Sequence, residues 1–350
     1  MALGFEYFLI AGLIIGFIFG FILQSGRFCM NSAFRDIILL KEFKLAKAVA
    51  VSLAVLAVGF SIFAFAGLIN LTPKPFAPYA AIVGGLIFGI GMVFAGGCAS
   101  GTTYRVGEGM MGSFVAAIGL TVGALMTAGG VFSDISIWLK SFNYGQITLV
   151  GLYDPLNLML PIFMLILGIV GIALMFFFWA WPALKKRGDK PLVKFDNVVE
   201  QSLKKAYPWW VTGILIGLIL TAGYVASGGV VGITGGWMNI SGWLTAGEFS
   251  PTGGLGWSGF IIFGILIGAM VSAILKKEFK FRVPKDGLTL LKQFFGGILM
   301  GFGAVTAMGC NITNILGGIP QLSLHSIIVG VCIMLGSWLM AYLLFMRKED

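Results

Sequence analysis

Three of the four cysteines lie where a hydrophobic run ends in glycine and small polar residues. Cys98 follows a glycine pair, Cys310 follows Gly309, and Cys29 lies in the stretch LQSGRFCMNSAFRD after the first hydrophobic run. A thiol is a weak hydrogen-bond donor and a soft, polarizable acceptor. Thiols in these positions would suit a ligand with a soft sulfur or selenium atom better than a hard cation.

The segments around Cys98 and Cys310 repeat one another. The first is GGLIFGIGMVFAGGCASGTTYRVGEG, which begins at Gly84, and the second is GGILMGFGAVTAMGCNITNILGG, which begins at Gly296. In one fixed register, Gly84, Gly85, Gly89, Gly91, Gly97 and Cys98 coincide with Gly296, Gly297, Gly301, Gly303, Gly309 and Cys310. The coincidence indicates an internal duplication whose two halves meet at a shared site.

Composition assigns the chain to the membrane. Of its 350 residues, 58% are hydrophobic and 11% are charged, whereas soluble domains carry about 25% charged residues. Several apolar runs reach the roughly 20 residues that a spanning helix needs, and the alternating runs of a spanning β-barrel are absent. We therefore predict an all-α polytopic membrane protein with about nine spans, at 5–24, 48–69, 80–97, 110–130, 158–182, 209–227, 257–275, 293–309 and 323–345.

Lysine and arginine residues indicate the orientation of these spans. The loops alternate so that 21 of these residues fall on one side of the membrane and two, Lys74 and Lys140, on the other. Basic loops stay in the cytoplasm. We therefore predict an outside N-terminus and a cytoplasmic C-terminus, and we attribute the net charge of +9 to topology rather than to a nucleic-acid partner.

The duplicated segments then run in opposite directions through the membrane. The first span echoes the sixth in the same antiparallel sense, since Gly12 and Gly16 match Gly213 and Gly217. An inverted repeat of this kind is typical of transporters, whose substrate sites lie between the repeats. We predict a first half at 1–182, a basic cytoplasmic connector at 183–208 and a second half at 209–350, with short re-entrant helices and a pseudo-two-fold relation.

The helix breaks beside the cysteines are the predicted substrate pathway. Broken backbone at membrane depth is tolerated where it is buried in protein or lines a polar cavity, and N–H groups at helix N-termini suit an oxyanion. The pathway residues are Cys29, Cys98 and Cys310, supported by Gly97, Ser100, Gly101, Thr102, Arg105, Gly309 and Asn311. Cys332, in an apolar span, and the single histidine, His325, are expected to be structural, and Gly12, Gly16 and Gly20 to pack helices.

Motifs of other function classes are missing from the sequence. It contains no GxxxxGK[ST] phosphate loop, no HExxH, no GxSxG and no CxxC pair, and it has one histidine. We therefore expect no enzyme activity, no cofactor and no metal site.

Taken together, the motifs resemble those of the YeeE/YedE family of bacterial thiosulfate-uptake permeases. The matching stretches are Gly26–Asp36, Gly84–Gly109 and Gly296–Asn311 with Leu324-His325. The resemblance implies an hourglass of tilted and broken helices in the bacterial inner membrane. It also implies thiosulfate as substrate, Cys29, Cys98 and Cys310 as pathway cysteines making transient S–H···S contacts, and a TusA-type cytoplasmic sulfur carrier. The faces available to that carrier are the basic loops 185–205 and 276–292.

Other functions remain open at this point. The family has a selenium-associated branch, which these motifs do not separate from the thiosulfate permeases, and the polar stretch 228–256 matches no thiosulfate-specific pattern. Sulfite or another small sulfur anion is a further candidate substrate. A membrane thiol oxidoreductase would need two cysteines within disulfide reach and a resolving partner.

Overall fold

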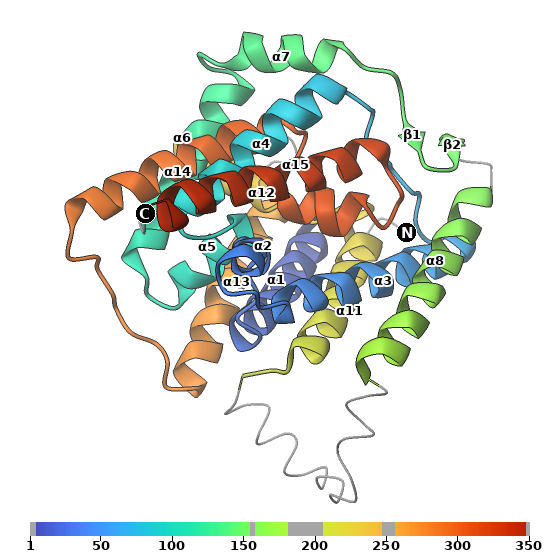
Figure 1. The fold of residues 1–350 in the computed structure, drawn as a ribbon, viewed down its shortest axis with the longest axis horizontal. Helices are drawn as coiled ribbons and strands as arrows, with labels where there is room; N and C mark the ends of the chain where they lie inside the picture. The colour runs from blue at the N-terminus through green and yellow to red at the C-terminus, as the bar shows by residue number, and fades with distance from the viewer. Residues whose placement is uncertain (1–4, 155–157, 181–205, 247–255, 348–350) are drawn as a thin grey trace, which may run out of the picture.

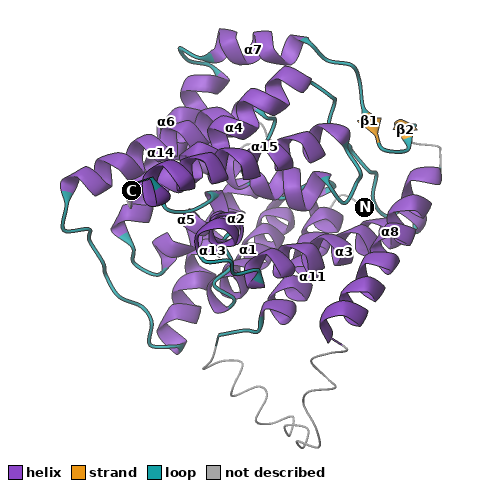
Figure 2. Cartoon of the chain, viewed as in Figure 1, coloured by secondary structure: helices purple, strands orange, loops and turns teal. Residues whose placement is uncertain are grey.

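The computed structural model describes residues 5–154, 158–180, 206–246 and 256–347. Within these ranges the chain is almost wholly helical, with one short hairpin at the edge (Figure 2). Nine helices or helix pairs in the described part are long and apolar enough to cross a membrane, which confirms the predicted polytopic all-α class. The membrane-length helices are α1 (Phe5–Ser25), α3 (Lys44–Phe65), α4 (Pro78–Ala95), α6 (Met111–Ala128), α8 (Met159–Met175), α11 (Trp209–Ser227), α13 (Trp257–Leu275), α14 (Gly287–Thr306) and α15 (Leu324–Ala341).

Short elements connect or extend these helices (Figure 1). They are α2 (Met30–Leu39), α5 (Ala99–Gly107), α7 (Ser133–Ser141), α12 (Ile233–Ala246), the strands β1 (Ile147–Thr148) and β2 (Gly151–Leu152), and the π-helices η1 (Phe176–Ala180), η2 (Ile312–Gly318) and η3 (Tyr342–Met346). Helices α2 and α5 begin directly after Cys29 and Cys98, and η2 begins two residues after Cys310. The predicted helix breaks are therefore present.

Several predicted boundaries differ from the structure. Helix α14 begins at Gly287 rather than at 293, because Asp286 caps it by accepting a hydrogen bond from the Leu288 N–H at 3.1 Å. Helix α3 runs four residues earlier than predicted at both ends, from Lys44 to Phe65. The stretch 228–256 contains a helix, α12, that was not predicted. Its sequence is rich in Gly, Thr, Asn and Ser, which have low helix propensity.

The packing of helices follows an inverted repeat. Helix α1 packs on α13 and α3 packs on α11, and exchanging α1 with α11 and α3 with α13 converts each pairing into the other. In the same way, α4 packs on α15 while α14 packs on α6. The pairs α5–α6 and η2–α15 are related by the same exchange. Helix α8 has no counterpart and stands at the edge of the bundle (Figure 1).

Glycines bring the paired helices together. On α1, a Cβ added to Gly20 would lie 2.6 Å from Ile265 Cα of α13, and one added to Gly16 would lie 2.9 Å from Ile261 Cα. Gly12 lies against Trp257 in the same pair. These contacts agree with the packing role expected for the three glycines, because side chains there would force the backbones apart.

A second set of glycines joins α4 to α14, and we call it the glycine seam: Gly84, Gly91, Gly296 and Gly303. A Cβ at Gly303 would lie 2.6 Å from both the Gly84 carbonyl oxygen and the Phe88 nitrogen. A Cβ at Gly91 would lie 2.7 Å from the Met300 nitrogen. The two repeated helices thus meet backbone to backbone.

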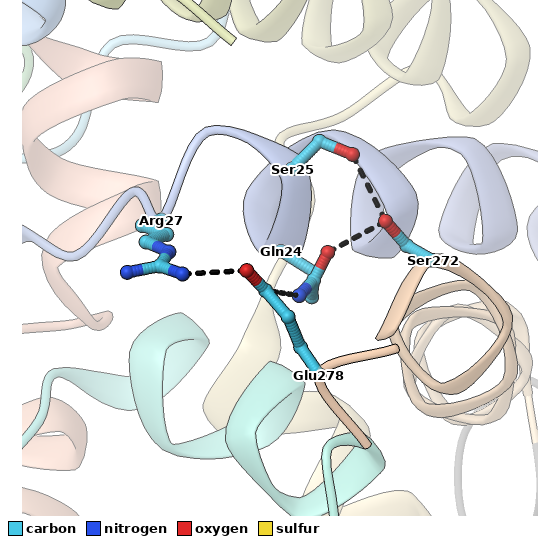
Figure 3. Close-up of polar contacts among 5 residues, drawn as sticks. All are labelled: Gln24, Ser25, Arg27, Ser272 and Glu278. Atoms are coloured by element: carbon cyan, nitrogen blue, oxygen red, sulfur yellow. Dashed lines mark hydrogen bonds and ion pairs between the residues drawn. The ribbon is translucent and has the colours of Figure 1, made fainter. Parts of the chain in front are cut away.

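Loop contacts fall into two separate sets. Among the loops predicted to be cytoplasmic, Glu278 accepts from Gln24 Nε2 at 2.8 Å and from Arg27 Nη2 at 2.6 Å, while the Ser272 hydroxyl donates to Gln24 Oε1 at 2.6 Å (Figure 3). The Met111 N–H, at the start of α6, donates to the carbonyl of Arg282, which lies in the same loop as Glu278. This grouping is what the predicted alternation of loops requires.

Loops predicted to lie outside contact one another in the same way. The Thr72 N–H donates to Gln321 Oε1 at 2.9 Å, and the Thr72 hydroxyl lies 3.0 Å from the Tyr224 hydroxyl. The Phe76 N–H donates to the Gly145 carbonyl at 2.7 Å. Most of the connector 183–208 lies outside the described residues, so the division of the chain into halves stays a prediction.

Candidate functional site

The three cysteines of the predicted pathway follow the same backbone turn. In each case the residue two positions earlier is left-handed, with φ of 48° at Arg27, 73° at Gly96 and 54° at Met308. The next N–H then donates to the carbonyl five residues earlier, from Phe28 to Leu23 (2.9 Å), from Gly97 to Met92 (3.1 Å) and from Gly309 to Ala304 (2.7 Å). This pair of features is the Schellman motif, which ends a helix and redirects the chain.

Each cysteine also begins the next helix. The carbonyl of the cysteine accepts from the N–H four residues later, from Ala33 to Cys29 (2.9 Å), from Thr102 to Cys98 (2.7 Å) and from Asn314 to Cys310 (2.9 Å). The first N–H groups of a helix lack partners within it and carry partial positive charge. The structure therefore places each of the three thiols at a helix end that attracts anions.

Cys29 and Cys98 are in direct contact. Their Sγ atoms lie 3.7 Å apart, and both residues are at most 1% exposed. Cys98 Sγ also accepts a hydrogen bond from the Gly101 N–H at 3.3 Å and lies 3.4 Å from Ser100 Oγ. A Cβ on Gly101 would lie 2.6 Å from Cys29 Sγ and 3.2 Å from Cys98 Sγ, so glycine at this position leaves room for the thiol pair.

The residue after Cys310 contacts the residue after Cys29. Asn311, next to Cys310, donates from Nδ2 to Met30 Sδ at 3.0 Å, and Met30 directly follows Cys29. Thr313 Oγ1 lies 3.7 Å from Cys310 Sγ and donates to the Cys310 carbonyl at 3.0 Å. In the described residues, the segment that begins at Cys310 therefore contacts the segment that begins at Cys29 through Asn311 and Met30.

Two buried amide side chains beside these sulfur atoms have polar atoms with no partner among the described residues. They are both Nδ2 and Oδ1 of Asn31 and Oδ1 of Asn311. The two residues are at most 1% exposed. An unsatisfied buried polar group costs about 1–3 kcal/mol, so these atoms are suited to a polar ligand.

Arginine residues play different parts. Arg27 forms an ion pair with Glu278 and its side chain is 65% exposed, while Arg35 pairs with Asp36. Arg105 donates from Nη1 to the Gly96 carbonyl, inside the Schellman turn before Cys98. Arg105 forms no ion pair within 4 Å with a carboxylate of the described residues.

His325 is fully buried and held by backbone groups. Nδ1 accepts from the Ala77 N–H at 3.4 Å, and Nε2 lies 3.1 Å from the Ala307 carbonyl. Because Nδ1 accepts, the ring is neutral with its proton on Nε2. This geometry agrees with the structural role expected for the residue. Cys332 is buried on α15 against Gly85, also as expected.

The predicted supporting residues gather around two of the thiols. Gly97, Ser100, Gly101 and Thr102 surround Cys98, and Gly309 and Asn311 flank Cys310. Sequence reasoning missed Met30, Lys74 and Asn314. Lys74 Nζ donates to the Met308 carbonyl at 2.6 Å and to Asn314 Oδ1 at 3.0 Å. The available signal was that Lys74 is one of two basic residues on the predicted outer side.

Comparison with known proteins gives the same family as the motifs. A family model described as sulphur transport matches residues 25–339. The chain is 39% identical to the thiosulfate transporter TsuA of Spirochaeta thermophila, over 96% of this chain and 99% of that protein. It is 30% identical to the thiosulfate transporter TsuA of Escherichia coli, over 97% and 96% of the two chains.

A shorter match covers part of another relative. The chain is 32% identical to the probable transporter YedE of Salmonella typhimurium over 155 residues, which are 44% of this chain and 37% of that protein. The relatives are named as transporters, which supports a permease rather than an enzyme. The nine apolar helices of the described residues make this a multi-pass membrane protein. The matched model and the two full-length relatives show that the chain belongs to the sulphur transport family, the YeeE/YedE family that its cysteine motifs resemble.

Proposed function

We propose that this chain is an inner-membrane permease that imports thiosulfate along a cysteine-lined pathway. The observation that carries the proposal is the buried pair of Cys29 and Cys98, with Sγ atoms 3.7 Å apart and the Gly101 N–H on Cys98 Sγ. The thiols suit the terminal sulfur of the ion, and the backbone N–H groups of α5 suit its oxygens. The names of the two full-length relatives support the same substrate.

The ion would pass through weak contacts at several stations. At each one a thiol donates an S–H···S hydrogen bond to the sulfur end, and no covalent bond forms. Asn31 Nδ2, which has no partner among the described residues, is available to an oxygen. Weak binding at successive sites favours transport because the ion must leave each site as readily as it enters.

Contacts of the turns suggest the order of the stations. The turn that carries Cys310 is held by Lys74 and Ser326, from segments of the predicted outer side. The turn that carries Cys29 is held through Arg27 by Glu278, from the predicted cytoplasmic side. With basic loops in the cytoplasm, the ion would meet Cys310 first and then the Cys29–Cys98 pair.

Uptake of radiolabelled thiosulfate by cells that lack other sulfur transporters tests the proposal. We expect uptake with the chain and none without it, and competition by unlabelled thiosulfate but not by sulfate or selenite. Absence of uptake from cells that contain the chain in their membranes would refute the proposal. Uptake that selenite blocks would favour a selenium compound as the natural substrate.

The alternative function is that of a thiol oxidoreductase, in which Cys29 and Cys98 would form and break a disulfide. Cys29 and Cys98 lie close enough that side-chain rotation would bring them into disulfide range, which gives this alternative one structural argument. Labelling of free thiols in growing cells discriminates the two functions. Persistent free Cys29 and Cys98 support the permease, while a disulfide that forms and breaks during turnover supports the oxidoreductase.

A TusA-type carrier would receive the ion at the cytoplasmic face. Loop 276–292 presents the exposed residues Lys280, Arg282 and Lys285, a face suited to an acidic partner. The second basic loop, 185–205, lies outside the described residues. Loss of carrier binding after charge reversal of all three residues, with thiosulfate entry into vesicles retained, would support this docking. Unchanged binding would contradict it.

A further inference from the structure

Lys74 lies where a charge is unusual. It belongs to the loop between α3 and α4, is partly buried, and donates from Nζ to the Met308 carbonyl at 2.6 Å and to Asn314 Oδ1 at 3.0 Å. Both partners are neutral oxygens. No carboxylate of the described residues lies within 4 Å of this ammonium group. A cation that is partly removed from water and has no counter-ion is costly, and an anionic ligand would reduce that cost.

The backbone beside Cys310 is shaped around this ammonium group. Gly309 has φ of 146°, and a Cβ on it would lie 2.6 Å from Lys74 Nζ. Only glycine therefore lets the charge lie directly against the peptide that precedes Cys310. Asn314 Oδ1, which also accepts from Ser326 Oγ at 3.2 Å, holds the ammonium from the far side.

The other half of the molecule repeats this arrangement with a different residue. In the register that aligns Cys98 with Cys310, Gly96 aligns with Met308, and both residues are left-handed. The Gly96 carbonyl accepts from Arg105 Nη1, and the Met308 carbonyl accepts from Lys74 Nζ. Arg105 follows Cys98 by seven residues, about two helical turns, whereas Lys74 comes from the loop between α3 and α4. Two unrelated positions thus supply one cation to each equivalent carbonyl.

We propose that Lys74 is a substrate-binding residue that supplies the outer positive charge of the pathway and selects dianions with a terminal sulfur. The oxygens of the ion face Lys74 while its sulfur faces Cys310 and Thr313. Arg105 provides the matching charge at the inner thiol pair. This inference rests on the proposed thiosulfate uptake and adds to it a residue, a role and an order of binding.

The surroundings of Lys74 make the binding sensitive to pH. Removal from water lowers the pKa of Lys74 to about 7, and the neighbouring Cys310 raises it in part. The other titratable group that faces it is His325, whose ring is neutral in its hydrogen bonds to Ala77 and Ala307. The anion binds the protonated amine, so KM should rise as the external pH increases above about 7.

Uptake kinetics of Lys74 variants test the inference. We expect Lys74→Met to raise KM for thiosulfate by ~10-fold or more, which corresponds to about 1.4 kcal/mol of binding, while protein abundance in the membrane stays unchanged. Lys74→Arg should retain uptake with a KM that no longer depends on pH between about 6 and 9, because arginine stays charged. Lys140→Met, which removes the other outer lysine, is the matched control and should behave as wild type.

The uptake results for Lys74→Met and for the wild type test the role of Lys74 and the permease function separately. Wild-type uptake with an unchanged KM in Lys74→Met would overturn the role of Lys74 and leave the permease intact. Absence of uptake by the wild type would overturn both. If Lys74→Met fails to reach the membrane, the pH profiles of the wild type and of Lys74→Arg decide: a wild-type KM that is constant from about pH 6 to 9 contradicts the inference.

Discussion

Cys29 Sγ lies 3.7 Å from Cys98 Sγ. Gly101 lies against both sulfur atoms, since a Cβ added to it would lie 2.6 Å from Cys29 Sγ and 3.2 Å from Cys98 Sγ. The pair comes from two Schellman turns in different parts of the sequence. The first predictions concern these thiols and the glycine that admits them.

Removal of a pathway thiol should stop transport without unfolding the protein. We expect Cys98→Ala and Cys310→Ala each to lower uptake of radiolabelled thiosulfate by ~10-fold or more, because one station loses its S–H donor. Cys332→Ala is the matched control, since Cys332 is a buried cysteine of α15 outside the pathway. Near wild-type uptake by both pathway variants would contradict the mechanism.

Oxidation should lock the inner pair. A thiol oxidant such as diamide is expected to join Cys29 to Cys98 and to block uptake, with recovery after dithiothreitol, because the two Sγ atoms are already in contact. Mass spectrometry of the digested protein identifies the cross-link. Cys29→Ala is the control for the cross-link alone, because it removes the partner and should give no Cys98 disulfide in the digest. A disulfide that leaves uptake unchanged would show that the pair does not line the path.

A methyl group at Gly101 should displace Cys29. Gly101→Ala places a Cβ 2.6 Å from Cys29 Sγ, so the thiol must rotate away from Cys98. We expect strongly reduced uptake at normal protein abundance. Gly235→Ala, in the short helix α12 with open space around it, should leave uptake unchanged. Equal uptake by the two variants would contradict the role given to Gly101.

Substitution in the glycine seam should lower stability. Gly303→Ala brings a Cβ to 2.6 Å from backbone atoms of α4, which can only be relieved by separating the helices. Overpacking of this kind costs about 1–3 kcal/mol, and we expect a lower Tm in detergent. Gly171→Ala of α8, whose Cβ would lie 3.6 Å from Ala54 Cβ, is the control and should melt as the wild type does.

The network around Glu278 predicts a pH-dependent effect on stability. Burial would raise the pKa of Glu278, but hydrogen bonds from Arg27 and Gln24 hold it below its usual 4.5. Because the folded pKa is the lower one, the carboxylate stabilises the fold above about pH 4.5, and this contribution is lost as pH falls through the folded value. Glu278→Gln should therefore lower Tm at pH 7 and not at low pH.

The size of that effect should be small. The side chain of Arg27 is 65% exposed and that of Glu278 is 35% exposed, so solvent screens the pair and the loss should stay below about 1 kcal/mol. Glu42→Gln removes the more exposed pair with Lys44 and serves as the comparison. A Tm difference for Glu278→Gln that persists at low pH would assign the effect to packing instead.

Much of the architecture follows from local sequence. Hydrophobic runs predict the nine spans, and the repeated glycines predict both the inverted relation and the helix breaks at Cys98 and Cys310. Helix α12 was missed because its stability comes from packing on α13 and α5, where Trp237 Nε1 donates to Thr103 Oγ1 at 2.9 Å. Local propensity contains no information on such tertiary contacts.

Only part of the site could be predicted from the sequence, because some of its contacts are also tertiary. The types and neighbours of Cys29, Cys98 and Cys310 single out these residues, but the contact between Cys29 and Cys98 depends on how α1 and α4 are placed. Lys74 was counted only as an exception to the charge rule. Its position beside Cys310 depends on the fold of a loop that returns to the Met308 turn.

The glycine seam limits how the protein can move. Many transporters with inverted repeats expose their site alternately by rocking one repeat against the other. Here α4 and α14 touch through their backbones at Gly84, Gly91 and Gly303, with no intervening side chains to slide. Rocking would open a gap between these two helices. Ion movement would then depend on rotation of thiols and small shifts of α2, α5 and η2, so the surrounding lipids would meet nearly the same outline throughout the transport cycle.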